Sequence, residues 1–252
     1  MFDQPPARAT PWYMIHGGRY EGVEPPFFDP ENHPWVRTLE ENWTTIRDEI
    51  LSLLARRDER LEPYFNKAMV FPPRSWKTLG FYFWKYRIHK NCRECPETTR
   101  ILESIPNMTA GSLSVLEPHA NINPHQGDTN AIIRVHLGLV IPDSLPDCGF
   151  QVGREIRAWE EGKAMLFLDA MTHSAWNQSD RRRLVLIVDV MRPEFASQTD
   201  DICTHVLAST VLQMLYQRFG WLNALPGRFK YIVHLLARLL LRCWLPLQRR
   251  LG

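Results

Sequence analysis

Four short segments of β-type sequence occur between residues 111 and 191, separated by turns rich in Pro, Gly, Asn and Asp. The segments are 111–118, 131–141, 163–169 and 182–191. The last, RRLVLIVDVM, alternates most clearly, because its aliphatic side chains fall on one face of a strand: Leu184, Leu186, Val188 and Val190. Several short strands divided by turn residues predict a β-sandwich or barrel.

Helical sequence flanks this β segment on both sides. Apolar residues recur at helical spacing over residues 36–57, and a short helix is expected over 98–105. Residues 1–35 are rich in Pro and aromatic residues and predict an irregular arm that packs on the body. Residues 71–90 predict no clear element, and the chain becomes helical again after Pro193.

The composition is that of an ordinary globular protein, with 252 residues, 44% hydrophobic and 23% charged. The net charge of +2 is unevenly distributed, because six basic residues and no acid lie between Arg228 and the end. The preceding residues therefore carry about −4. A basic end on a mildly acidic body favours an acidic partner surface or anionic lipid, and we expect no nucleic-acid partner.

Cysteine usage and the start of the chain bear on location. The first 14 residues contain no apolar core of signal-peptide length, and five mostly well-separated cysteines fit a reducing compartment. We therefore expect a cytoplasmic protein, with peripheral membrane contact as an alternative. Cys92 and Cys95 form one C-x-x-C, but the second ligand pair that a zinc site needs is missing.

Four of the nine histidines fall in one 55-residue stretch of the β-type sequence: His119, His125, His136 and His173. Arg183 begins the next expected strand ten residues after His173. Each residue alone is more often an ordinary surface or core residue. Together, imidazoles at strand ends suit a ferrous site that keeps positions open for a chelating co-substrate and dioxygen. A dicarboxylate co-substrate would also need a cation at fixed distance, which Arg provides in bidentate fashion.

The stretch PHQGDTNAIIRVHLGL at 124–139 adds polar residues to the same region. On a strand, Arg134, His136 and Gly138 project to one face, and the aliphatic residues between them project to the other. An Arg and a His on an inward face need partners for their charge and hydrogen bonds. The segment is therefore either an ordinary turn and strand or one wall of an active site, depending on what else the chain brings to that face.

Four segments resemble the aspartyl/asparaginyl β-hydroxylases: SVLEPHANINPH, HQGDTNAIIRVHLGLVIP, RAWEEGKAMLFLD and HSAWNQSDRRRLVLIVDVMRPE. Those enzymes are iron(II)- and 2-oxoglutarate-dependent dioxygenases with a double-stranded β-helix, a cupin-like jelly roll. The resemblance covers roughly residues 72–195. It implies Fe(II), 2-oxoglutarate and O2 as cofactor and co-substrates, and hydroxylation of an unactivated C–H bond with release of succinate and CO2.

The same resemblance implies residue roles. His125 and His173 would be the iron ligands, and Ser114 and Arg183 would hold the far carboxylate of 2-oxoglutarate.

Arg134 and His136 would face the metal-bound end of the co-substrate or a substrate carboxylate. Most oxygenases of this kind place a carboxylate two residues after the first histidine, where this chain has Gly127. The Asp/Asn hydroxylases also lack it, and water completes the metal shell. Asp128, one position further on, is an alternative ligand.

For the whole chain we expect a mainly β jelly-roll core with N-terminal and C-terminal helices packed around it. Residues 1–195 would form one oxygenase domain, with an arm and helices over 1–110 and the jelly roll over 111–195. Residues 196–252 would be a C-terminal helical extension.

The substrate stays open between two classes. The first is the β-carbon of an aspartyl, asparaginyl or related amino-acid substrate, which could be free, in a peptide or on a carrier. The motif HQGDTN resembles that of the Asp/Asn hydroxylases more closely than that of the lipid hydroxylases. The alternative is a fatty acyl chain of a membrane lipid, as in lipid A and ornithine-lipid hydroxylases. Ile132 replaces a basic residue of the vertebrate peptide-hydroxylating members. A jelly-roll binding module without catalysis is the alternative from another class.

The segment 228–250 is apolar but carries Lys230, His234, Arg238 and Arg242 at intervals of four residues. A membrane-spanning helix would bury those charges, so we expect no span. We expect a helix that packs on the body or on a homodimer partner, with its basic stripe in solvent. The alternative is a basic amphipathic helix that lies on a bilayer surface.

Overall fold

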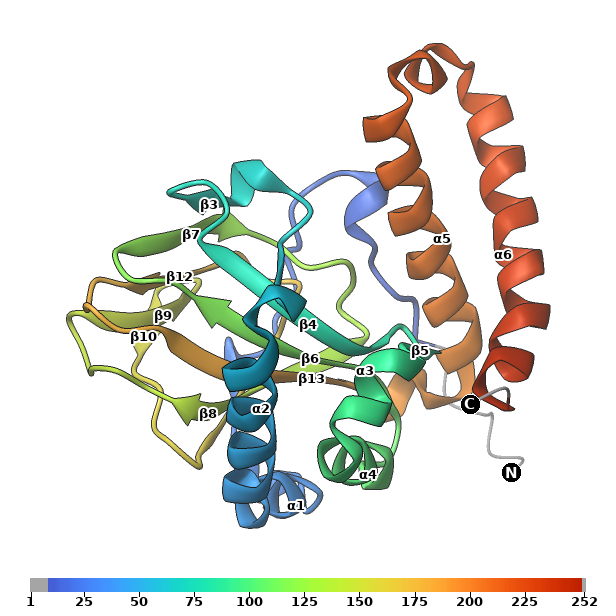
Figure 1. The fold of residues 1–252 in the computed structure, drawn as a ribbon. Coiled ribbons are helices and arrows are strands. Elements are labelled where there is room, and N and C mark those ends of the chain that lie inside the picture. The colour runs from blue at the N-terminus through green and yellow to red at the C-terminus, as the bar shows by residue number, and fades with distance from the viewer. Residues whose placement is uncertain (1–8, 251–252) are drawn as a thin grey trace, which may run out of the picture.

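Two antiparallel sheets packed face to face form the centre of the protein in a computed structural model that describes residues 9–250 (Figure 1). The larger sheet has eight strands in the order β1-β11-β8-β13-β6-β4-β2, with β5 paired to β4, and the smaller has the order β10-β9-β12-β7-β3. The strands of the larger sheet are β1 (Phe27–Phe28), β2 (Glu62–Pro63), β4 (Trp76–Phe83), β5 (Tyr86–Arg87), β6 (Met108–Leu116), β8 (Ile132–Val140), β11 (Ala164–Phe167) and β13 (Arg183–Met191). Those of the smaller sheet are β3 (Val70–Phe71), β7 (Ala120–His125), β9 (Cys148–Val152), β10 (Glu155–Arg157) and β12 (His173–Asn177).

Along the strands of the larger sheet, side chains alternate between two faces. Apolar side chains lie on one face, and the polar residues proposed for the site lie on the other. On β8, Val135 and Leu137 join the core beneath the helices, whereas Arg134 and His136 face the space between the sheets. On β13, Arg183 likewise lies on the inner side. The period of two therefore directs the polar candidates inward and leaves a continuous aliphatic outer face.

The helices before β6 cover that outer face. Side chains of α1 and α2 and of α3 and α4 pack with the strands in one core. The α-helices are α1 (Val36–Glu41), α2 (Trp43–Arg57), α3 (His89–Glu94), α4 (Pro96–Ser104), α5 (Thr199–Arg218) and α6 (Gly227–Arg250). The 3-10 helices are η1 (Met14–His16), η2 (Pro30–Asn32), η3 (Asp58–Arg60), η4 (Lys67–Met69), η5 (Pro193–Gln198) and η6 (Gly220–Ala224).

The mainly β jelly-roll fold with helices on both sides is confirmed, but several local expectations differ from the structure. The helix expected over 36–57 is interrupted at Asn42, and the unassigned segment 71–90 contains β4, an inner strand of the larger sheet. The arm over 1–35 contributes β1, which pairs with β11. Residues 1–8 and 251–252, with the expectations about them, lie outside the described part of the chain.

After the jelly roll, α5 and α6 form a helical hairpin that rises beside the sheets, with η6 at its tip (Figure 1). The first half of α5 packs on the body through Ile202 and Val206, which share a core with Trp84 and Ile132. The hairpin is the C-terminal helical extension expected from the sequence. Within residues 9–250, none of the helices combines the length and apolar content that crossing a membrane would need.

Candidate active site

His125 and His173 face each other across two neighbouring strands of the smaller sheet. His125 ends β7, His173 begins β12, and the two are paired in register. Their ring centroids lie 4.2 Å apart. The histidines, 48 positions apart in the sequence, are therefore brought together at one point of the sandwich.

Backbone carbonyls determine which nitrogen of each ring is free. Nδ1 of His125 lies 2.8 Å from the carbonyl oxygen of Asn123, and Nδ1 of His173 lies 2.8 Å from that of Met171. A carbonyl oxygen only accepts, so each Nδ1 carries the proton and each Nε2 keeps a lone pair. Burial lowers the pKa of both imidazoles, so they are neutral near pH 7. Both rings are thus in the form that ligates a metal ion.

Arg183 is a buried cation without an acidic partner. Its side chain is 1% exposed, its guanidinium lies 4.6 Å above the Trp159 ring, and Nη1 is 3.4 Å from both oxygens of Ser114. Its Nε is buried with no hydrogen-bond partner, and the described residues give it no carboxylate in ion-pair contact. Burial lowers the pKa of Arg183 to about 10, which still leaves it charged at neutral pH. A desolvated, partly unsatisfied guanidinium is a receptor for an anion.

His136 lies between the Arg183 guanidinium and the pair His125 and His173. Its ring is packed between Phe150 and Phe167, with centroids at 4.9 and 4.8 Å, and Nδ1 accepts a hydrogen bond of 3.3 Å from the Trp159 indole. Burial, aided by the charge of Arg183, lowers the pKa of His136 well below its usual value. The neutral ring then carries its proton on Nε2 and can donate one hydrogen bond.

Arg134 is held by two buried carboxylates. Its Nε and Nη2 donate to Asp189 at 2.7 and 2.8 Å, and its Nη1 donates to Asp169 Oδ1 at 2.5 Å. Burial raises the pKa of Asp169 to about 7, and the guanidinium opposes that shift. Asp169 Oδ1 is also 3.7 Å from Nε2 of His173. The guanidinium thus fixes a carboxylate beside one of the two free imidazole nitrogens.

Gly127 makes room for that carboxylate. A Cβ on Gly127 would lie 1.6 Å from Oδ2 of Asp169, and the Gly127 amide donates to the Asp169 carbonyl at 2.8 Å. Oδ2 is buried and has no hydrogen-bond partner. Asp169 therefore brings an oxygen to the position where a side chain two residues after His125 would otherwise lie.

Asp128, the alternative ligand, has other neighbours. Burial raises its pKa to about 6, and the groups that act on it are Arg134, Asp189 and the Trp84 indole rather than either histidine. His119 lies on the surface, where its Nε2 is 3.0 Å from Asp180. Over the described residues, neither Asp128 nor His119 joins His125 and His173 in a group that could hold a metal ion.

Sequence reasoning missed Asp169, Asp189, Trp76 and Trp159 as parts of the site. Trp76 donates to Ser114 Oγ at 3.0 Å and stacks on Tyr64, and Trp159 contacts both Arg183 and His136. Asp169 is the last residue of the strand predicted over 163–169, and a buried-type strand that ends on an acid four residues before His173 could have indicated it.

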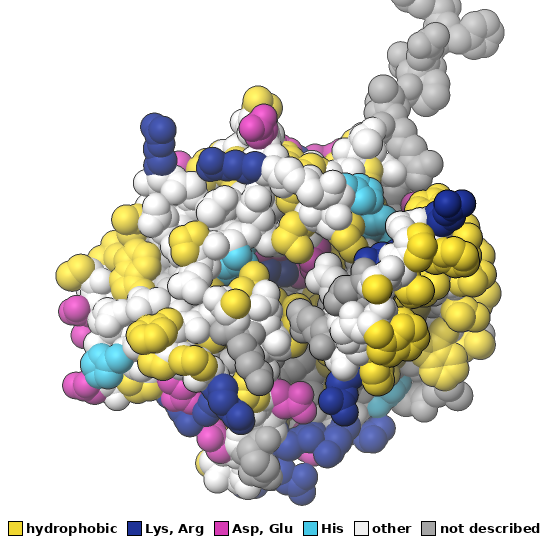
Figure 2. Space-filling view, turned by 90° about the horizontal axis from the view of Figure 1, so that it is seen from above, with side chains coloured by type: hydrophobic (Ala, Val, Ile, Leu, Met, Phe, Trp, Pro, Cys, Tyr) yellow, Lys and Arg dark blue, Asp and Glu magenta, His cyan; other side chains and the backbone are white. Residues whose placement is uncertain are grey.

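The side chains present suit a metal ion held by two imidazoles. Two neutral rings present Nε2 from neighbouring strands, and Oδ1 of the Asp169 carboxylate lies 3.7 Å from Nε2 of His173. Over the described residues, no group of three or more His, Cys, Asp or Glu is arranged to hold a metal ion. Two imidazoles occupy only two coordination positions, so a metal held by this pair would keep other positions for water and a co-substrate. On one face of the molecule, a central hollow exposes histidine, basic and acidic side chains (Figure 2).

A family model described as aspartyl/asparaginyl beta-hydroxylase matches residues 40–193. The ornithine lipid ester-linked acyl 2-hydroxylase of Rhizobium tropici is 32% identical over 174 residues, which cover 67% of this chain and 61% of that protein. The human aspartyl/asparaginyl beta-hydroxylase is 33% identical over 168 residues, covering 65% of this chain and 22% of that one. The match thus spans less than two thirds of each relative.

Among solved structures, the non-heme alpha ketoglutarate dependent carbocyclase SnoK from nogalamycin biosynthesis is similar with a TM-score of 0.43 and 14% identity. The similarity covers 60% of this chain and 75% of that one. A likeness of this size supports no functional statement.

Proposed function

Because the chain belongs to the aspartyl/asparaginyl β-hydroxylase family, we propose that it is an iron(II)- and 2-oxoglutarate-dependent hydroxylase of an unactivated C–H bond. The observation that carries this proposal concerns Arg183. Its guanidinium is buried and has no acidic partner among the described residues, and it lies in the same interior as two neutral imidazoles whose Nε2 atoms can ligate a metal ion. A structural arginine would normally be paired, because an uncompensated buried charge is destabilising. A dicarboxylate chelated to a metal would satisfy both features at once.

In this proposal His125 and His173 hold the ferrous ion through Nε2. Ferrous ion with 2-oxoglutarate and dioxygen supplies the oxidising chemistry, in which the co-substrate is converted to succinate and CO2 and one oxygen atom enters the substrate. The carbonyls of Asn123 and Met171 keep both rings in the ligating tautomer and orientation. The protein thereby fixes the geometry of the site without a third side-chain ligand.

Arg183 and Ser114 bind the far carboxylate of the co-substrate. The planar guanidinium offers two parallel N–H donors, and the Ser114 hydroxyl, which accepts from Trp76, can turn its own proton toward an anion. His136 donates from Nε2 to an oxygen of the co-substrate. Phe150 and Phe167 exclude water around His136, which strengthens each of these interactions.

Arg134 acts as a positioning residue in this proposal. Its guanidinium is occupied by Asp169 and Asp189, so its charge is offset before a substrate binds. The oxygen of Asp169 without a partner can accept a hydrogen bond from water at the metal. This assignment differs from the expectation that Arg134 would face the metal-bound end of the co-substrate or a substrate carboxylate.

For the substrate, the β-carbon of an aspartyl, asparaginyl or related side chain remains the first candidate, after the family description. A second candidate, an acyl chain of a lipid, is favoured by the charge state of the site. Ile132, the position of a basic residue in the peptide-hydroxylating relatives, is fully buried in the core shared with α5. Arg134 is already paired with Asp169 and Asp189, so neither position offers a free positive charge to an aspartate side chain. The similar Rhizobium tropici protein is an acyl hydroxylase by name.

The test is succinate formation from 2-oxoglutarate by the iron-loaded protein, measured with and without each candidate substrate. Substrates would be aspartate, asparagine, Asp/Asn-containing peptides, carrier-bound aspartate and acyl lipids. The true class should stimulate succinate release and gain one oxygen atom by mass spectrometry. Absence of succinate in every mixture, with metal and 2-oxoglutarate bound, would favour a binding module instead.

A further inference from the structure

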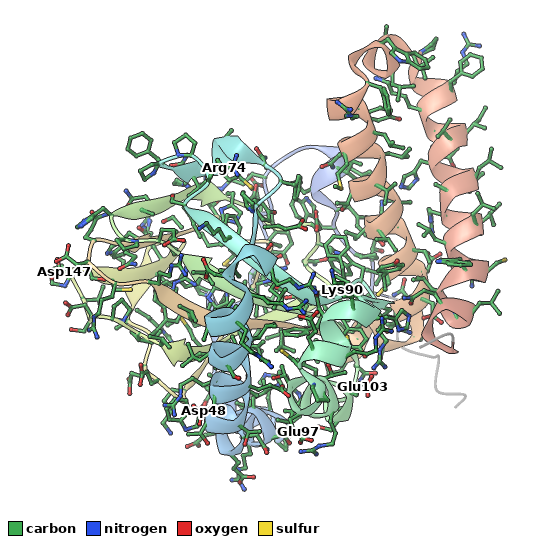
Figure 3. All side chains as sticks on the ribbon, viewed as in Figure 1. Asp48, Arg74, Lys90, Glu97, Glu103 and Asp147 are labelled. Atoms are coloured by element: carbon green, nitrogen blue, oxygen red, sulfur yellow. The ribbon has the colours of Figure 1, made fainter. Side chains whose placement is uncertain are left out.

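The amphipathic helix α6 lies with its apolar side away from the protein. Exposed side chains recur at helical spacing on one side of the helix, and we call them the outer apolar face: Phe229, Ile232, Leu236, Leu239, Leu240 and Leu247. Their exposed fractions run from 48% at Ile232 to 72% at Leu240. Side chains on the free side of α6 are mostly carbon, whereas the charged residues labelled in Figure 3 all lie on the body.

Two residues of the basic stripe of α6, His234 and Arg238, face α5 instead of solvent. His234 Nε2 is 2.9 Å from the Ser209 hydroxyl, and Arg238 donates to Asp201 at 2.6 Å. Near the end of the helix, Leu245 and Gln248 are buried against the body. The expectation that the basic stripe would be in solvent is therefore wrong for His234 and Arg238, whereas Arg242 is 65% exposed. The apolar side of the helix is left uncovered. Contiguous exposed apolar surface of this kind marks an interaction site.

The charge at the hairpin tip and along the chain beyond Asp201 is positive. No Asp or Glu occurs after Asp201, whereas Arg218 and Arg228 flank the hairpin tip and are exposed. The tip also exposes aromatic side chains, with Trp221 and Tyr231 each 69% exposed. Aromatic residues beside basic ones at the edge of an apolar face are typical of the interface between water and lipid.

We propose that the outer apolar face and the hairpin tip form a docking surface for an anionic phospholipid bilayer. The apolar side chains enter the boundary of the acyl chains, and Arg218 and Arg228 lie among the phosphates. A second copy of the chain is the less suitable occupant, because the exposed Arg218 and Arg228 at the hairpin tip have no acidic residue after Asp201 in the sequence to complement them in a second copy of the same face. Hydrophobic side chains of the hairpin gather to one side of the face that carries the central hollow (Figure 2).

The test is flotation of the full chain with vesicles of phosphatidylcholine alone or with about one third phosphatidylglycerol. The protein should float with the anionic vesicles at low salt and bind phosphatidylcholine at least about tenfold more weakly, since each basic residue near an anionic surface strengthens the binding. Raising the salt to about 1 M should remove most of this preference, because screening then acts within about 3 Å.

The decisive variant is Leu236→Glu/Leu240→Glu, which should lower the partition coefficient by at least about tenfold. Leu51→Glu, at a 39% exposed position of α2, is the matched control and should bind like the original protein. Circular dichroism should show all variants folded. The measurement needs no turnover, so its outcome is separate from that of the proposed hydroxylase activity.

Two results would overturn this proposal. One is a protein that stays with neither vesicle at low salt. The other is a dimer in light scattering that Leu236→Glu/Leu240→Glu converts to monomer without any vesicle binding by the original protein, which would show that a second copy covers the face.

Discussion

Asp169 occupies the space that a side chain on Gly127 would need: Oδ2 of Asp169 lies 1.6 Å from the Cβ position of Gly127. Gly127 is two residues after His125, and Asp169 is four residues before His173. The two positions are therefore alternatives, because only one of them can place a side chain at this point of the site.

The first prediction tests this exclusion. Gly127→Ala should lower the free energy of unfolding by about 1–3 kcal/mol, because the added methyl group displaces a buried carboxylate. Asp169→Ala should remove the conflict, so Gly127→Ala should cost less in that background by about 1 kcal/mol or more. Denaturant unfolding of the four proteins measures the coupling. Additive effects would show that the two side chains do not compete.

The second prediction concerns Arg183 without its ligand. Arg183→Met should raise the stability of the ligand-free protein by about 1–2 kcal/mol, because it removes a buried charge with no acidic partner. The same change should weaken 2-oxoglutarate binding on the order of a hundredfold, since each 1.4 kcal/mol is tenfold. Thermal unfolding and calorimetric titration measure the two effects.

Arg181→Ala and Arg182→Ala are the matched controls for Arg183. Arg182 pairs with Asp58 and Glu117 in half-exposed ion pairs. Neither control should change the affinity for 2-oxoglutarate. Equal losses in all three variants would contradict the assigned role of Arg183.

The third prediction is that the same substitution at Arg134 has the opposite effect on stability. Arg134→Met leaves the buried carboxylates of Asp169 and Asp189 without their cation, so it should destabilise the protein by about 3–5 kcal/mol. Urea unfolding beside Arg183→Met gives a direct comparison. Stabilisation by both substitutions would mean that the ion pairs of Arg134 contribute nothing.

The fourth prediction concerns pH and the hairpin. Burial lowers the pKa of His205 on α5 to about 4, and His234, Arg238 and His16 add to the shift, while Asp201 opposes it. Tyr13 packs on the same ring at 4.1 Å. The unfolded chain therefore binds more protons between pH 6.5 and 4, and stability should fall as the pH decreases through that range.

His205→Phe keeps the ring and removes this titration. The variant should lose about 1–3 kcal/mol less stability than the original protein between pH 7.5 and 4.5. Chemical unfolding at the two pH values measures the difference. An identical loss in both proteins would assign the acid sensitivity to other groups.

Strand alternation predicted part of the site from the sequence alone. Arg134 and His136 are separated by one aliphatic residue, so a strand must place both on the face opposite its apolar core. The inward face of β8 follows directly from that period. Strand β4 was missed because buried side chains lie on both of its faces, which removes the alternation.

Other parts of the site depend on contacts between distant residues. The role of Asp169 arises from Gly127, which is 42 residues away and has no side chain that could signal it. The orientation of α6 was predicted the wrong way round for a similar reason. Periodicity shows which residues share a face, but Asp201 and Ser209 determine which face is covered.

The most direct test of the proposed site is an anaerobic calorimetric titration of 2-oxoglutarate into the protein with and without one equivalent of Fe(II). We predict binding of one equivalent that requires the metal and disappears in His125→Ala and in His173→Ala, while circular dichroism shows both variants folded. Binding of equal affinity without the metal, or retained in His173→Ala, would contradict a metal centre built on this histidine pair.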